Sequence, residues 1–131
     1  MTRNWLKYQD SDCYPRHVFL DAEESEEIVS LLETRAIRKK FDYIVNRILN
    51  QQNLYYEAYQ KIPGYKDLSE MRLFPNGLNI RFYCKEFSCS NGQFYVVVAK
   101  LLMKKKSEKI NKEIQDLLKP IEDYDYEFWK I

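Results

Sequence analysis

The spacing of apolar residues predicts helices in the first part of the chain. Residues 17–20 (HVFL) form a short extended run. Two helices follow, at about 22–34 and 36–51, because their apolar residues recur on a single helical face. These positions are Ile28, Leu31 and Leu32 in the first helix and Ile37, Phe41, Ile44, Val45, Ile48 and Leu49 in the second. A helical hairpin and one long helix with a bend near Thr34 both fit this pattern.

The beginning of the first helix carries an expected capping signal. Asp21 is followed by Glu24 three positions later, the spacing of an N-cap and its capping-box partner. Acidic residues in the first turn also suit the helix dipole. We therefore expect the first helix to begin directly after Asp21.

The second part of the chain changes to strand periodicity. It predicts three antiparallel strands at 70–74, 78–87 and 93–103, separated by turns at PNG (75–77) and SNG (90–92). The VVV run within 93–103 indicates burial on both faces of the sheet. A last helix at 107–118 is expected to be capped by Ser107 and stopped by Pro120.

These elements define an α+β fold: an N-terminal strand and two helices, a three-stranded antiparallel meander, and a C-terminal helix. A length of 131 residues suits one domain with a single core, with residues 1–15 and 120–131 as possible extensions. The acidic, aromatic tail is expected to pack on the sheet or on a partner.

Composition narrows the function classes. No apolar window is long enough to span a membrane, and the N-terminus does not resemble a signal peptide. Three cysteines and one histidine provide too few ligands for a typical zinc site, so we expect no metal or cofactor and reduced thiols in the cytoplasm. The lone His17, in an apolar stretch, is expected to be structural.

Positive charge is concentrated although the formal net charge is only +1. Residues 100–112 hold Lys100, Lys104, Lys105, Lys106, Lys109 and Lys112 against Glu108 alone. A polyanion responds to such a local field more than to the total charge. Residues 21–27 (DAEESEE) are, by contrast, strongly acidic.

Alternation in the meander predicts a second group of cations. Arg81, Tyr83 and Lys85 point away from Ile80, Phe82 and Cys84, and Arg72 is expected on the same face. The lysines 104–106 end the next strand, where they can reach that face. Taken alone, this pattern is explained more simply by a solvated face with lysines for solubility.

The sequence offers few groups for catalysis. It has no glycine-rich phosphate loop and no recognisable Ser-His-Asp arrangement. RNA cleavage suits such a chain, because the adjacent 2′-hydroxyl is the nucleophile and cations stabilise the pentavalent phosphate. A lysine or tyrosine with a lowered pKa would then move the proton.

Three segments resemble the toxins of the RelE/ParE superfamily of type II toxin–antitoxin systems, in particular the HigB-like branch. They are LSEMRL (68–73), NIRFYC (79–84) and LLMKKKSEKINKEIQDLL (101–118). In the family these segments read roughly as an L-x-E-[IL]-R strand, an R-[IVL]-x-[YFC] strand and a lysine-rich strand-to-helix junction. The similarity covers about 50 residues, and the order and spacing of the segments carry it.

The resemblance implies a RelE-like fold, metal-independent cleavage of mRNA on the ribosome, and neutralisation by a cognate antitoxin of helix-turn-helix type. By position, Arg81 would bind the scissile phosphate, and Arg72 would either bind a neighbouring phosphate or hold the sheet face. Lys104 or Lys105 would stabilise transition-state charge or transfer a proton. RNA-binding roles fall to Tyr83, as a base-stacking platform, and to Lys85, Lys100 and Lys106.

The chain also departs from the family pattern. Lys106 and Ile110 replace the threonine and proline after the paired lysines, and the tyrosine that some members carry in the last helix has no counterpart. Two alternatives therefore stay open: a gyrase-binding, ParE-like toxin and a non-catalytic interaction protein with the same fold. The interferase hypothesis requires accessible arginines that are not buried in structural ion pairs.

Overall fold

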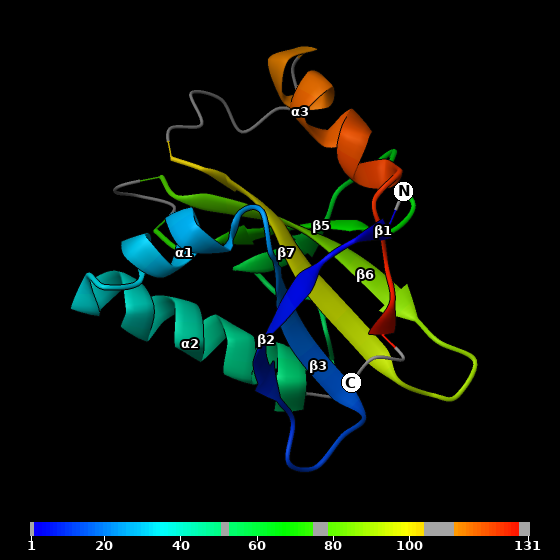
Figure 1. Ribbon diagram of the computed structural model, residues 1–131. Coiled ribbons are helices and arrows are strands. Elements are labelled where there is room, and N and C mark those ends of the chain that lie inside the picture. The colour runs from blue at the N-terminus through cyan, green and yellow to red at the C-terminus, as the bar shows by residue number, and fades with distance from the viewer. Residues whose placement is uncertain (1, 51–52, 75–78, 104–111, 129–131) are drawn as a thin grey trace.

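The computed structural model describes residues 2–50, 53–74, 79–103 and 112–128, which form a mixed sheet with helices on both faces (Figure 1). The strands are β1 (Thr2–Arg3), β2 (Trp5–Asp10), β3 (Arg16–Asp21), β4 (Tyr59–Lys61), β5 (Leu68–Arg72), β6 (Arg81–Ser88), β7 (Phe94–Leu102) and β8 (Asp125–Tyr126). The helices are α1 (Ser25–Leu31), α2 (Arg35–Asn50) and α3 (Lys112–Glu122). The α+β class and the predicted order of the main elements are confirmed.

The main sheet has the strand order β2-β3-β7-β6-β5-β4 among the described residues. β3 and β7 are parallel, whereas the other neighbouring strands are antiparallel. β5, β6 and β7 form the predicted meander. The pairing of β3 with β7 brings the N-terminal strand into the centre of the sheet.

One face of the sheet packs on α1 and α2. The apolar stripe of α2 is buried as predicted, with Phe41 against Phe82 at a ring-centroid distance of 5.0 Å. Val18, Val96 and Val98 complete this face from β3 and β7. α1 and α2 are separate helices, because the chain turns between Leu31 and Arg35.

The other face is covered as well. Ile114, Leu118 and Ile121 of α3 pack with Leu68 and Tyr83 of the sheet, and residues 124–128 pack beside them. Burial on both sides explains why Val96, Val97 and Val98 are all fully buried, as the VVV run predicts. The described part of the acidic tail therefore packs on the sheet.

Two predicted helix boundaries are wrong. α1 begins at Ser25, after a turn in which the Asp21 carboxylate accepts the Glu23 amide while it also binds Arg3 and Tyr126. α3 continues through Pro120 to Glu122. A proline in the last turn removes only one backbone hydrogen bond, and the continued turn buries Ile121 in compensation. The expected Ser107 cap lies outside the described residues.

The first residues form strands that the sequence did not indicate. β2 adds to the edge of the main sheet beside β3, and β1 pairs in parallel with β8. In β2 the apolar Leu6 is half exposed and the register shifts between Lys7 and Gln9, so apolar and polar residues do not alternate regularly. The β1–β8 pair joins both ends of the chain, which no local pattern can predict.

Candidate functional site

The predicted cationic residues of the meander share one face of the sheet. Arg72 lies opposite Arg81 in the β5–β6 pair, and Glu70 lies opposite Tyr83. Lys85 lies opposite Leu68 on the same face. Directly opposed side chains in an antiparallel pair are close neighbours. The sequence alternation therefore places these groups correctly.

The expected exposure of this face is wrong. Arg81 is 1% exposed, Tyr83 is fully buried and Lys85 is 9% exposed. Only Arg72 reaches solvent to any extent, with 21% of its side chain exposed. The apolar stripe of α3 needs a surface to cover, and the Tyr83 ring and Leu68 supply one on this face.

Glu70 lies between the two arginines. Its Oε1 atom accepts a hydrogen bond from Arg72 Nε at 2.7 Å and lies 4.0 Å from Arg81 Nε. Glu70 is itself 4% exposed, so the carboxylate is buried with the cations. Sequence analysis missed this role, although Glu70 stands two residues before Arg72 and so shares its face.

The Arg81 guanidinium is incompletely satisfied. Its Nε and Nη1 atoms are buried and have no hydrogen-bond partner among the residues described, and the Tyr83 hydroxyl is in the same state. Buried polar atoms are nearly always hydrogen-bonded, and a buried cation without close partners is costly. The arrangement therefore has an unused capacity to donate hydrogen bonds to an anion.

The environment of Tyr83 suits neither proton transfer nor its predicted role as a stacking platform in this arrangement. Burial, followed by the nearby Glu70 carboxylate, raises the pKa of Tyr83 above its usual value. A raised pKa keeps the hydroxyl protonated at neutral pH, the opposite of what a general base requires. A fully buried ring also cannot act as a stacking platform for bases.

Lys85 is a structural residue in this arrangement. Its ammonium group donates hydrogen bonds to the carbonyl oxygens of Glu122 and Tyr124, at 2.6 and 2.7 Å. Burial lowers the pKa of Lys85, although carboxylates led by Asp67 oppose the shift. Lys85 thus fastens the end of α3 to β6, which corrects its assignment to RNA binding.

Replacing Lys85 by methionine is expected to loosen the end of α3. Two carbonyl oxygens would lose their charged donor, at a cost of about 1.5–3 kcal/mol per hydrogen bond before compensation by water. Hydrogen exchange should show faster exchange of the Leu118 and Ile121 amides, with a lower Tm. An exchange pattern equal to that of wild type would show that the lysine does not hold the helix.

The remaining predicted cations divide into two groups. Lys100 Nζ forms an ion pair with Glu24 Oε1 at 3.1 Å, and 36% of its side chain is exposed. It stays available to solvent, but a carboxylate already neutralises it. Lys104, Lys105 and Lys106 lie outside the described residues.

Other reactive side chains are either held or dispersed. The His17 ring nitrogens lie 2.7 Å from Asp10 Oδ1 and 2.6 Å from Gln93 Oε1, and the ring stacks on Tyr95. Cys13, Cys84 and Cys89 are free thiols. Over the ranges the structure describes, no three His, Cys, Asp or Glu side chains gather as metal ligands, and no helix is long and apolar enough to cross a bilayer.

No family model matches the chain, and comparisons with curated proteins and with solved structures also find no match. The resemblance to the RelE/HigB toxins therefore depends on the three sequence segments alone. The function of Arg72, Arg81 and Glu70 is therefore inferred from their own geometry and chemistry.

Proposed function

We propose that this chain has a RelE-like fold and is the toxin component of a toxin–antitoxin system, cleaving mRNA on the ribosome. Two nitrogens of the Arg81 guanidinium have no partner among the described residues, and this observation carries the proposal, although the burial of Arg81 departs from the accessible arginines that the sequence hypothesis required. A phosphate oxygen is a strong acceptor for these donors. The order of the central elements, in which β3 is followed by two helices, the β5–β7 meander and a last helix, also supports it.

The proposal gives each residue a defined role. Arg81 binds the scissile phosphate and stabilises the charge that develops when the 2′-hydroxyl attacks. Arg72, one strand away and partly exposed, binds a neighbouring phosphate. Glu70 holds both guanidinium groups in place until RNA arrives. Lys104 and Lys105 remain the proposed source of further charge or of a proton.

Access to Arg81 requires a change in structure. At 1% exposure the guanidinium cannot contact RNA until part of the cover on its face, to which α3 contributes, has moved. In the proposed function this opening accompanies binding to the ribosome, and a cognate antitoxin would prevent it. The arrangement described here is then the closed state.

The same burial favours a second function. If α3 stays in place, Arg81 and Arg72 are structural partners of Glu70, and the chain is a non-catalytic interaction protein with the same fold. This alternative explains the buried Arg81–Glu70 pair without any motion. It does not explain why two buried nitrogens of Arg81 lack a hydrogen-bond partner among the described residues.

Induced expression with mapping of mRNA ends by primer extension tests the proposal. Wild-type protein should stop growth and cleave within translated codons, and Arg81→Met should lower cleavage by about 10²–10³-fold, as loss of one charge-stabilising donor does elsewhere. The matched control is Lys66→Met, which removes an exposed cation from the segment between β4 and β5 and should cleave like wild type.

Each other outcome points to a different function. Growth arrest with intact mRNA and an induced DNA-damage response would indicate a gyrase-binding toxin. Absence of toxicity from a folded, well-expressed protein would support the non-catalytic alternative. Equal cleavage by wild type and Arg81→Met would remove Arg81 from the mechanism.

A further inference from the structure

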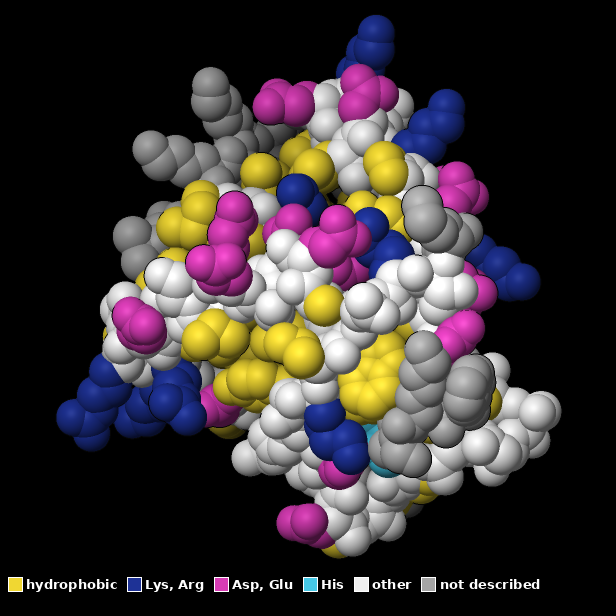
Figure 2. Space-filling view, viewed as in Figure 1, with side chains coloured by type: hydrophobic (Ala, Val, Ile, Leu, Met, Phe, Trp, Pro, Cys, Tyr) yellow, Lys and Arg dark blue, Asp and Glu magenta, His cyan; other side chains and the backbone are white. Residues whose placement is uncertain are grey.

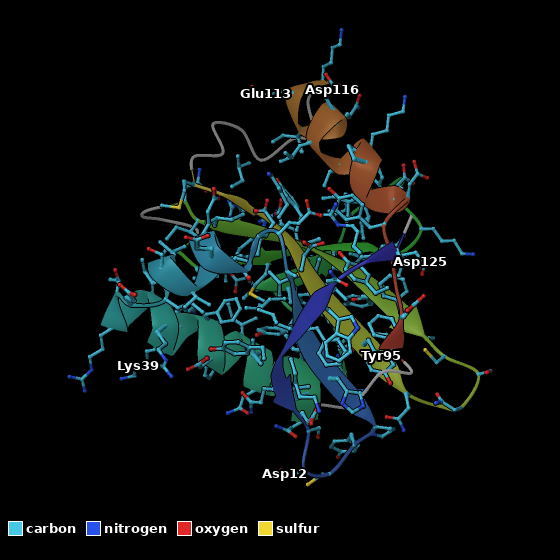
Figure 3. All side chains as sticks on the ribbon, viewed as in Figure 1. Asp12, Lys39, Tyr95, Glu113, Asp116 and Asp125 are labelled. Atoms are coloured by element: carbon cyan, nitrogen blue, oxygen red, sulfur yellow. The ribbon has the colours of Figure 1, made fainter. Side chains whose placement is uncertain are left out.

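The outer face of α2 is the strongest exposed concentration of positive charge among the described residues. Arg35, Arg38 and Lys39 are exposed, and Lys40 is partly exposed beside them. Figure 2 shows these dark blue side chains gathered at one end of the molecule, and Figure 3 shows Lys39 extending from α2 away from the sheet. The opposite face of α2 carries the residues that are buried in the core, so the outer face is not needed for core packing.

These cations do not stabilise the helix that carries them. Four of them lie in the first two turns of α2, where the helix dipole disfavours positive charge, and the first turn has no acidic residue. The only acidic partner described for them is Asp42, 3.7 Å from Arg38. Repulsion and the dipole both act against this arrangement, so a role in stability does not explain it.

An exposed aromatic ring lies within the charged surface. Tyr43 is 53% exposed and one helical step from Lys39, and Lys40 Nζ lies 5.5 Å from its ring centroid. Arg35, Lys39 and Tyr43 recur every four residues, so they form one stripe along the helix. Cations interleaved with an accessible aromatic ring suit nucleic acid, whose phosphates pair with the cations and whose bases stack on the ring.

We propose that the outer face of α2, formed by Arg35, Arg38, Lys39, Lys40 and Tyr43, binds the phosphate backbone of RNA. Successive cations of the stripe stand about 6 Å apart along the helix axis, so their long side chains can pair with neighbouring phosphates of one strand. RNA is favoured over an acidic protein surface because one RNA strand offers phosphates to the cations and bases that stack on the exposed ring.

This surface is separate from Arg81. α2 packs on one face of the sheet, and Arg81 lies on the face that α3 covers. An RNA segment on α2 is therefore not the segment that would be cleaved, and α2 instead anchors the protein on structured RNA. The inference rests on the proposed function in one respect, the choice of RNA as the polyanion that binds α2.

Fluorescence anisotropy with a labelled RNA hairpin tests the inference on the full chain. Arg35→Gln/Lys39→Gln should weaken binding by about tenfold and reduce the slope of log affinity against log salt by about 1.4–1.8, or 0.7–0.9 for each lost phosphate contact. Its Tm should stay the same or rise, since the dipole opposes these charges. The control Lys61→Gln/Lys66→Gln makes the same charge change at exposed positions elsewhere and should bind like wild type.

Several results would overturn the inference. They are absence of RNA binding by the wild type, equal loss of affinity in both double variants, or competition by polyglutamate as effective as that by RNA at equal charge. A parallel cleavage assay separates this inference from the proposed function. Binding through α2 without cleavage by any variant would refute only the endonuclease, whereas cleavage with binding unaffected by Arg35→Gln/Lys39→Gln would refute only the α2 surface.

Discussion

Replacing Asp21 by asparagine is expected to lower the free energy of unfolding by about 3–5 kcal/mol, the typical cost of removing one member of a buried ion pair. The carboxylate is fully buried at the end of β3. It accepts hydrogen bonds from Arg3 at 2.6 and 3.0 Å, from the Tyr126 hydroxyl at 2.5 Å and from the Glu23 amide at 2.8 Å. One side chain thus joins β1, β3 and β8.

A matched control lies on the same arginine. Glu23 also pairs with Arg3, at 2.8 Å, but 71% of its side chain is exposed. Glu23→Gln should therefore cost less than about 1 kcal/mol, as exposed ion pairs do. Urea unfolding of the two variants compares buried and exposed carboxylates with a shared partner. Equal losses would show that burial does not govern the strength of this junction.

The pH dependence of stability provides a second measurement on Asp21. Burial alone would raise its pKa, but the hydrogen bonds from Arg3 and Tyr126 outweigh burial and lower it. A lowered pKa in the folded state adds stability that is complete above the unfolded value of about 3.9 and is lost as the pH falls through the folded value. The Tm difference between wild type and Asp21→Asn should be constant from about pH 8 to 5 and shrink below about pH 4.

Asp21 also shows which parts of the fold the sequence could predict. The α2 stripe and the VVV strand were predictable because their periods of 3.6 and 2 are complete within a few residues. The Asp21–Glu24 spacing resembled a cap, but the partners that decide the role of Asp21 are 18 and 105 residues away. A local signal fails when a distant partner binds the same group more strongly.

The candidate site illustrates the same limit. Strand alternation correctly placed Arg72, Arg81 and Tyr83 on one face, because register follows from the meander. It could not predict that α3 covers that face, since an apolar stripe says that a helix is buried and not which surface buries it. The basic surface of α2 is present in the sequence as an i, i+4 pattern of Arg35, Lys39 and Tyr43, but the lysines of residues 100–112 are the denser basic segment.

Replacing Arg81 by methionine is expected to stabilise the protein by about 1–3 kcal/mol, the cost of leaving a buried donor unsatisfied, because Glu70 keeps its hydrogen bond from Arg72 after the change. Methionine fills much of the same volume beside Leu102, the cross-strand neighbour of Arg81 in β7, and needs no hydrogen-bond partner. The gain arises because two guanidinium nitrogens are buried without a partner among the described residues, and the Glu70 carboxylate is 4.0 Å away.

Arg72→Met is the control for this substitution, and urea unfolding measures both. Arg72 hydrogen-bonds Glu70 at 2.7 Å, so its loss leaves a nearly buried carboxylate with its closest described cation removed. This variant should be less stable than wild type, opposite in sign to Arg81→Met. A loss of more than about 1 kcal/mol in Arg81→Met would mean that its guanidinium is well compensated where it lies.

Stability and cleavage measured on Arg81→Met together decide what the guanidinium is for. A variant that is more stable and no longer cleaves would show that Arg81 costs stability and is explained by its action on phosphate, a conflict typical of functional sites. A variant that is more stable in a protein that never cleaves would leave Arg81 without a catalytic purpose and favour the interaction protein. A variant that is less stable and still cleaves would make Arg81 a structural cation, with catalysis elsewhere in the chain.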